Sequence, residues 1–411
     1  MFLYFKHIPV YTLTFSLLCS TLVLMQRIIA LIDCDCFFVS CERVKNPKLQ
    51  GKPVCVMTSG GDKGIIVSRS KEAKALGVKM GEPYFKTKVE HPEAICIPAH
   101  HTLYHEISQK VMDVIRDFTP DVEVVSVDEA YADVTGFNKL HQISYTEFIT
   151  NIRSAILNRT GIPVSIGLCS SKTLAKLASD KAKKCGGIYV IRPDKDVILA
   201  KVGDDPIDSV CGVGRQNSKH LLYNDVNTIR EYVSKDDSWL RKGFGVNGVT
   251  LKHELLGETV SVVNPKPEPP QSIQDTSAFD DFSTDPEFLH STLAAHIHNA
   301  SKKLRIWDGY CSRIAVMVRT KAFSVTQAEM KLEKPTNSEK TLRDAAHKLL
   351  DQLYHRGVLY RATGITLMDL TIGKKQQFSL FESLEPEDDK LSRVIDLLEN
   401  KFGAGIIKVG K

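Results

Sequence analysis

Two adjacent carboxylates, Asp128 and Glu129, interrupt the stretch DVEVVSVDEAYADVTG (residues 121–136), whose other positions are mostly typical of buried β-strands. Valine and tyrosine favour a half-buried pleated surface, so the stretch predicts two short strands around the acidic pair. An exposed turn would explain the two acids, since aspartate is common in turns. A bound divalent cation would also explain them, because it removes the cost of gathering anions in a partly dry place. The stretch alone leaves both explanations open.

A third candidate carboxylate, Asp33, ends the apolar run RIIALID (27–33), which is predicted to be a buried strand. If this strand lies beside the strand that precedes the acidic pair, Asp33 meets Asp128 and Glu129 at one sheet edge. Two like charges about 4 Å apart repel by about 4 kcal/mol at an effective dielectric constant of 20, and a divalent cation reverses that sign. Oxygen ligands favour Mg²⁺ or Mn²⁺ over zinc, and two such ions can support phosphoryl transfer. Asp35 is better explained as a helix N-cap.

The order of strands and helices predicts an α+β protein with several domains. A chain of 411 residues can form two to four domains. Hairpin-joined strands among helices suggest a sheet with helices on one face. Residues 205–257 read as mostly helical, the Pro-rich segment VNPKPEPPQ (263–271) as a linker, and 272–372 as strand, helix, strand, strand, helix, strand. Further helices are expected at 36–45, 68–78, 102–118, 145–159 and 171–184, with a short amphipathic helix at 391–402.

Charge and cysteine content restrict the classes of partner. The net charge of +5 permits a polyanionic partner without requiring one, because a basic groove can hide in a balanced total. The ten cysteines include no CxxC pair, so neither a zinc site nor a disulfide framework is indicated. We interpret them as reduced thiols of a cytoplasmic protein.

The N-terminal extension (1–25) contains an apolar, uncharged run at residues 8–25 that resembles a signal-peptide core or a marginal membrane span. Met25 is followed at once by the first predicted strand. We therefore interpret residues 1–24 as the product of an upstream start codon and Met25 as the initiator, and expect no membrane partner. A membrane anchor on a nucleotide-binding protein is the weaker alternative.

Four motifs in fixed order point to one family: LIDCDCFFVSCE, GIIVSRSKEAKALGVKMGEP, VVSVDEAYADVTG and SIGLCSSKTLAKLASDKAKK. Together they resemble the Y-family translesion DNA polymerases over about residues 26–372. The resemblance implies a multi-domain right-hand polymerase with a ferredoxin-like palm, small fingers, a helical thumb with a helix-hairpin-helix, and an α+β little finger. These parts would cover residues 26–42 and 100–203 (palm), 43–99 (fingers), 204–262 (thumb), 272–372 (little finger) and 373–411 (C-terminal tail).

The resemblance also implies the roles of the residues around the predicted metal site. Asp33, Asp128 and Glu129 would bind two Mg²⁺ ions, for which Mn²⁺ can substitute, with help from the backbone carbonyl of Cys34. Phe38 matches the steric gate, a bulky ring beneath the sugar that would clash with a ribose 2′-OH. Core packing is the alternative role for Phe38, and the two roles are compatible.

The incoming dNTP would meet side chains of two motifs. Ser68 and Lys74 lie in the fingers motif, where the family commonly has Asn-Tyr and an Arg and this chain has Ser70-Lys71 and Lys74. A lysine there acts as a point charge where arginine would form a fork. Lys183 matches a lysine that contacts the triphosphate. The alternative for each further lysine of this basic segment is a solvated surface charge (Lys172, Lys176, Lys181 and Lys184).

Primer-template DNA would be held mainly through its phosphates. CGVGRQNSKHL (211–221) has the Gly-x-Gly turn of a helix-hairpin-helix, in which Gly212 and Gly214 let backbone N–H groups approach a phosphate. Lys219 follows in the same helix. Sequence-independent phosphate contacts are also expected in the little finger, from among Arg305, Arg313, Arg319 and Lys321.

The segment QFSLF (377–381) resembles the peptide with which bacterial polymerases bind the sliding clamp. An apolar pentapeptide outside any domain is an aggregation liability, which favours a partner pocket. The contact residues would be Gln377, Phe378, Leu380 and Phe381.

The sequence thus predicts an error-prone, template-directed DNA polymerase that bypasses DNA damage during the SOS response and works in the cytoplasm at the nucleoid. The UmuC type, the catalytic subunit of polymerase V, fits better than the DinB type (polymerase IV). It would require a UmuD′-like subunit and a recombinase filament. The alternative is a non-catalytic DNA-binding adaptor that keeps the fold. His100, His101 and His105 are assigned no role.

Overall fold

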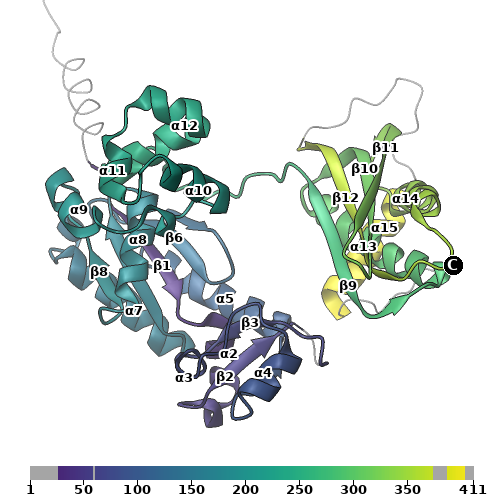
Figure 1. Cartoon of the computed structure of the whole chain (residues 1–411), viewed down its shortest axis with the longest axis horizontal. Coiled ribbons are helices and arrows are strands. Elements are labelled where there is room, and N and C mark those ends of the chain that lie inside the picture. The colour runs from purple at the N-terminus through teal and green to yellow at the C-terminus, as the bar shows by residue number, and fades with distance from the viewer. Residues whose placement is uncertain (1–25, 59–60, 374–386, 403–411) are drawn as a thin grey trace, which may run out of the picture. The chain divides into compact units, whose positions relative to one another are not determined.

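The chain forms two compact units, residues 1–267 and 268–411, which divide inside the Pro-rich segment 263–271 (Figure 1). The computed structural model describes residues 26–58, 61–373 and 387–402. The proposed start at Met25 and the QFSLF segment therefore lie outside the described residues. Within the described ranges, no helix is both long and apolar enough to cross a membrane.

A five-stranded sheet in the order β5-β6-β1-β7-β8 forms the centre of the first unit. Its strands are β1 (Ile29–Cys34), β5 (Val122–Val124), β6 (Glu129–Asp133), β7 (Val164–Cys169) and β8 (Ile188–Val190). The expectation that β1 lies beside the strand before the acidic pair is wrong, because β1 pairs with β6. β1 and β7 are buried at every position and take the centre, whereas β5 ends at the exposed Val124 and forms an edge. Val125 and Val127, predicted to be strand residues, are exposed in the connection.

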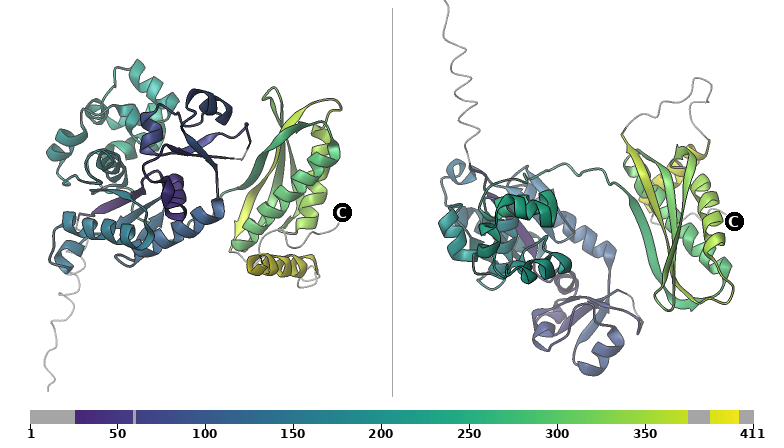
Figure 2. Two further views of the ribbon diagram at one scale, coloured as in Figure 1. Left: turned by 90° about the horizontal axis from the view of Figure 1, so that it is seen from below. Right: turned by 45° about the horizontal axis from the view of Figure 1, so that its top comes forward.

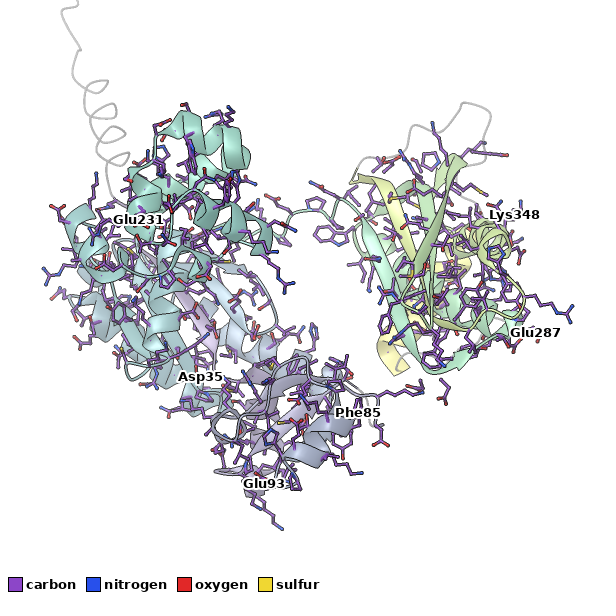
Figure 3. The ribbon with its side chains drawn as sticks, in the orientation of Figure 1. Asp35, Phe85, Glu93, Glu231, Glu287 and Lys348 are labelled. Atoms are coloured by element: carbon purple, nitrogen blue, oxygen red, sulfur yellow. The ribbon has the colours of Figure 1, made fainter. Side chains whose placement is uncertain are left out.

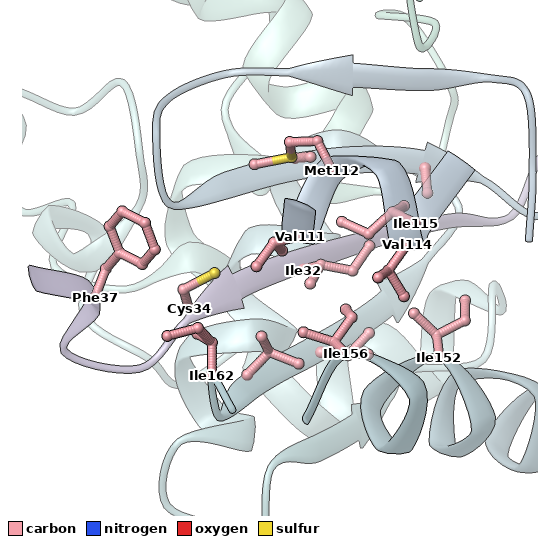
Figure 4. Close-up of a cluster of buried hydrophobic side chains, with 14 of the residues drawn as sticks. Ile32, Cys34, Phe37, Val111, Met112, Val114, Ile115, Ile152, Ile156 and Ile162 are labelled. Carbon is pink, nitrogen blue, oxygen red and sulfur yellow. The ribbon is translucent and has the colours of Figure 1, made fainter. Parts of the chain in front are cut away.

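Helices cover both faces of this sheet, although the sequence predicted only one covered face. Ile32 and Cys34 of β1 pack with α5 (His101–Arg116) and α7 (Tyr145–Thr160), as Figure 4 shows. Ile29 and Leu31 point to the other face and pack on Ala175 of α8 (Lys172–Ala182). Every residue of IALIDC except Asp33 is apolar, so both faces need cover.

Residues 54–98 contain a small sheet in the order β3-β2-β4. Its elements are β2 (Val54–Met57), β3 (Ile66–Arg69), β4 (Ile95–Pro98), α3 (Lys71–Ala75) and α4 (Tyr84–Glu90). The helix predicted over 68–78 is wrong at its start, because Ser68 and Arg69 pair with β2. The helix begins after Ser70, whose side chain caps it by accepting from the backbone N–H of Ala73.

The helical segment predicted at 205–257 packs around an apolar core that it shares with β7, α8 and the helix before it. It contains α10 (Arg215–Tyr223), α11 (Ile229–Ser234) and α12 (Asp237–Leu255), preceded by α9 (Lys195–Val202). Gly245 interrupts α12 with a φ of 68° and a ψ of −159°, which few residues other than glycine adopt. The core includes Leu221, Tyr232, Leu240 and Leu255.

The second unit has the predicted order of strand, helix, strand, strand, helix, strand: β9 (Ile273–Ser283), α13 (Pro286–Ile306), β10 (Gly309–Thr320), β11 (Val325–Thr336), α14 (Glu339–Leu353) and β12 (Tyr360–Ile372). Figure 2 shows both long helices on one side of the sheet, whose order is β11-β10-β12-β9.

A further helix, α15 (Glu387–Phe402), is held to this unit by ion pairs and begins four residues earlier than predicted. Arg305 forms a two-pronged pair with Asp396, at 2.6 and 2.8 Å, and Lys302 contacts Glu399 at 2.9 Å. The Arg305 side chain is only 7% exposed. A phosphate at Arg305 would therefore have to displace Asp396.

Candidate active site

The three predicted metal ligands lie at the same end of two adjacent strands. Asp33 and Glu129 are direct partners in the antiparallel register of β1 and β6. The backbone N–H of Cys34 donates to the carbonyl of Asp128 at 2.8 Å. Asp35, labelled in Figure 3 just beyond β1, is not the predicted N-cap: Cys36 takes that position, and the Asp35 carboxylate accepts from Ser165 at 2.8 Å.

Two lysines of the α8 segment bind these carboxylates. Lys176 Nζ donates to Asp33 Oδ2 at 2.9 Å and to Glu129 Oε2 at 2.7 Å, and Lys183 Nζ donates to Asp33 Oδ2 at 2.9 Å. Burial alone would lower the pKa of each lysine, but the carboxylate contacts outweigh it and raise both pKa values. Both lysines are therefore charged at neutral pH.

Lys176 was expected to be a solvated surface charge, but it lies between Asp33 and Glu129 and contacts both. The signal was its spacing: Lys176 and Lys183 are seven residues apart, so they fall on one face of a helix two turns apart. Lys183 was the residue expected to contact triphosphate. The same face therefore carries two cations toward Asp33.

Asp128 lies beside this cluster and has a different partner. Ser126 Oγ donates to Asp128 Oδ1 at 2.5 Å. Burial and then the charges of Asp128 and Asp33 raise the pKa of the Cys34 thiol well above its usual value. The Cys34 side chain is therefore a neutral thiol buried in the core beside α5 and α7.

The donor set suits a hard divalent cation in its chemistry. Within residues 26–58, 61–373 and 387–402, no group of three or more His, Cys, Asp or Glu side chains is placed to hold a metal ion. One ammonium nevertheless bonds both Asp33 and Glu129, so a single cation reaches both carboxylates. All the acidic donors are oxygens, as Mg²⁺ and Mn²⁺ prefer.

The Phe38 ring lies on α2 (Phe37–Lys45), one turn after the strand that carries Asp33. It is partly exposed, whereas the neighbouring Phe37 is buried in the core formed with β1, α5 and α7 (Figure 4). The Phe38 ring stacks on Tyr104 of α5, with centroids 4.5 Å apart and planes 15° apart. One face of the Phe38 ring is therefore packed against Tyr104, while part of the ring remains exposed.

The other predicted nucleotide contacts lie on β3 and α3. Ser68 is buried on β3, at 8% exposure, and Lys74 is exposed on α3. Lys183 is thus the predicted triphosphate residue that the structure brings to the carboxylates.

The glycine turn before α10 has an open backbone surface. Gly212 has a φ of 95°, and Gly214 is the N-cap of α10. A Cβ atom at either position would meet no atom of the described part of the chain within 4 Å. Lys219 is exposed on the same helix. Such a surface lets a phosphate approach the backbone N–H groups.

The two predicted arginines of the second unit differ in their surroundings. Arg313, 44% exposed, contacts Asp369 at 2.7 Å and Glu329 at 3.8 Å. Arg319 is half-buried, and its Nε has no hydrogen-bond partner among the residues that the structure describes. A phosphate at Arg313 would therefore compete with Asp369.

The sequence matches two family profiles. The impB/mucB/samB family matches residues 32–180, and its C-terminal domain matches residues 270–380. The chain is 33% identical over 395 residues to the protein UmuC of Salmonella typhimurium, which covers 92% of each chain. It is 31% identical to the protein ImpB of the same organism, over 92% of this chain and 91% of that one.

Similarity extends to polymerases of other bacteria and to solved structures. DNA polymerase IV 1 of Halalkalibacterium halodurans is 30% identical over 94% of this chain and 93% of its own. A Y-family DNA polymerase chimera of Dbh and Dpo4 superposes with a TM-score of 0.72 at 25% identity, over 84% of this chain and 99% of that chain. The chain therefore belongs to the impB/mucB/samB family of Y-family DNA polymerases.

Proposed function

We propose that this DNA polymerase is an error-prone translesion enzyme that adds dNTPs to a primer 3′-OH by two-metal-ion phosphoryl transfer, bypassing damage in the SOS response. One observation carries the proposal: Asp33 and Glu129 face each other on adjacent strands within reach of one cation, with Asp128 next in the chain. Such a pair of carboxylates is costly without a cation.

Asp33, Asp128 and Glu129 would hold the ions, with the backbone carbonyl of Cys34 as a further oxygen donor. When bound, two Mg²⁺ ions supply activation of the attacking oxygen and charge stabilisation of the leaving pyrophosphate. Bound ions would neutralise the charge of Asp33, so Lys183 would release Asp33 and contact the anionic triphosphate instead. The open turn at Gly212 and Gly214 would bind a DNA phosphate.

The UmuC type is supported by identities of 31–33% to ImpB and UmuC, next to 30% for a polymerase IV. We therefore include a UmuD′-like subunit and a recombinase filament as partners, and a sliding clamp that binds QFSLF. We place the protein in the cytoplasm, at the nucleoid during repair. A DinB-type enzyme would need only the clamp. A non-catalytic adaptor is less consistent with the chain, because Asp33, Asp128 and Glu129 are all retained side by side.

Primer extension tests the proposal. The purified full chain, with Mg²⁺, dNTPs, primed DNA and, in parallel reactions, clamp and UmuD′-like and recombinase proteins, should extend the primer. Asp128→Ala should extend it at least about a hundredfold more slowly, because an oxygen ligand is lost. Extension by both proteins at equal rates, or by neither in any reaction, would refute the proposal.

Changing Lys176 to Gln should weaken the fold without metal and tighten metal binding. Without the ammonium, Asp33 and Glu129 repel each other, so the free energy of unfolding in EDTA should fall by roughly 1–2 kcal/mol. Mg²⁺ no longer competes with the ammonium, so its Kd should fall about tenfold. Thermal unfolding in EDTA and across a Mg²⁺ titration measures both effects.

Lys181→Gln is the matched control for this change. Lys181 lies on the same helix and pairs with Asp205 at 2.8 Å. The side chains of both residues are 28% exposed. Its loss should leave the Mg²⁺ titration unchanged. Identical titrations for the two variants would show that Lys176 does not share the metal's oxygens.

A further inference from the structure

A buried carboxylate that the proposed chemistry does not use lies beneath the Phe38 ring. Glu42 of α2 is 3% exposed. Its Oε1 accepts from the Tyr104 hydroxyl at 2.7 Å and from His100 Nδ1 at 2.6 Å. A buried carboxylate needs such donors, so Glu42 ties α2 to the first turn of α5.

Tyr104 spans the face of α2 that carries both Phe38 and Glu42. These two residues are four apart, so their side chains lie one turn apart on the same helix face. The Tyr104 ring stacks on Phe38 at 4.5 Å, and its hydroxyl reaches Glu42. The Tyr104 ring is 1% exposed, and His101 adds an edge contact to Phe38, with centroids 6.3 Å apart.

We propose that Glu42 and Tyr104 are positioning residues for sugar selection, which hold the Phe38 ring where it excludes a ribose 2′-OH. This inference rests on the proposed role of Phe38 as the steric gate. The Tyr104 ring packs against one face of the Phe38 ring. The hydrogen bond from the Tyr104 hydroxyl to Glu42 fixes the position of the Tyr104 ring. Selection against one hydroxyl group depends on shifts of about 1 Å, so a fixed ring discriminates better than a mobile one.

The protonation of Tyr104 agrees with this arrangement. Burial raises the pKa of the Tyr104 phenol, and the Glu42 carboxylate raises it further. The phenol therefore keeps its proton at neutral pH and remains the donor. His100 Nδ1 must also donate, since a carboxylate oxygen accepts.

Tyr104→Phe tests the proposal, because it keeps the stacked ring and removes only the hydroxyl anchor. The ratio of kcat/KM for dNTP to kcat/KM for the matching rNTP should fall about five- to tenfold, the value of one buried hydrogen bond. The loss should come from faster ribonucleotide use. Glu42→Gln should shift the ratio in the same direction. A purely structural role would lower both substrates' kcat/KM and the melting temperature without changing the ratio.

Tyr145→Phe is the matched control, since the Tyr145 hydroxyl also makes one hydrogen bond in this unit, accepting from Gly136 N–H at 3.0 Å. Its ratio should stay at the wild-type value. The double variant Phe38→Ala/Tyr104→Phe should select sugars no differently from Phe38→Ala alone, because the anchor then has no gate to hold.

The outcomes separate this inference from the function on which it rests. If Phe38→Ala relaxes sugar selection and Tyr104→Phe does not, the gate stands and the positioning role is refuted. If Phe38→Ala leaves selection unchanged, the gate role itself fails. If Tyr104→Phe relaxes selection equally with and without Phe38, Tyr104 acts by another route and the inference is also overturned. If the wild-type chain extends no primer, both the proposed function and this inference are refuted.

Discussion

Changing Asp33 to Asn is expected to slow primer extension by roughly a thousandfold. Asp33 accepts from both Lys176 and Lys183 and faces Glu129, so it is the carboxylate on which the cations of the site converge. An amide keeps the shape and loses the charge that a divalent ion needs. The variant should still fold, because Lys176 retains Glu129 and Lys183 retains Asp180.

Single-turnover extension rates and the shift in melting temperature on adding Mg²⁺ or Mn²⁺ measure this effect. The extension rate should fall, and the metal-induced shift in melting temperature should disappear in the same variant. Asp35→Asn is a suitable control, because Asp35 is two residues away and its carboxylate accepts from Ser165 instead. An Asp33→Asn protein with near wild-type rates would exclude Asp33 from catalysis.

The largest loss of stability is expected from Gly167→Ala. A Cβ atom on Gly167 of β7 would collide with the backbone of α8, at Ser179 N, Ala175 O and the carbonyl carbon of Ala178. Backbone atoms cannot rotate away as a side chain can, so the helix must move as a whole. The free energy of unfolding should fall by roughly 3 kcal/mol, at the upper end of overpacking penalties.

Chemical denaturation of the full chain measures this loss, with Gly61→Ala as the control. A Cβ on Gly61 would meet no atom of residues 26–58, 61–373 or 387–402 within 4 Å. The Gly61 variant should unfold at the wild-type denaturant concentration. Equal stability of the two variants would show that α8 can lift from β7 at little cost.

The three carboxylates of the candidate site could be picked out from the sequence. The strand that lies next to β1 could not. Asp33 and Asp128-Glu129 stand out because acids in apolar strands require an explanation. Which strand lies next to β1 depends on burial across the whole sheet, so the pairing with β6 instead of β5 was not predictable from local pattern.

The errors at the fingers and at α8 have different causes. Ser68 and Arg69 have helix-compatible neighbours, and only cross-strand pairing with β2 makes them strand residues. The sequence around Lys176 does not distinguish it from a surface lysine. Its role follows only from the tertiary structure, in which β1 and β6 place two carboxylates next to it. The tie between Glu42 and Tyr104 joins residues 62 positions apart, which no single motif contains.

The docking of α15 makes this last described helix part of the same body as β12. β12 ends at Ile372, and α15, beginning at Glu387, contacts α13 through Asp396 and Glu399. The two elements that flank residues 374–386 in the sequence therefore belong to one unit. Cutting the chain after residue 386 would leave α15 attached to this unit through non-covalent contacts.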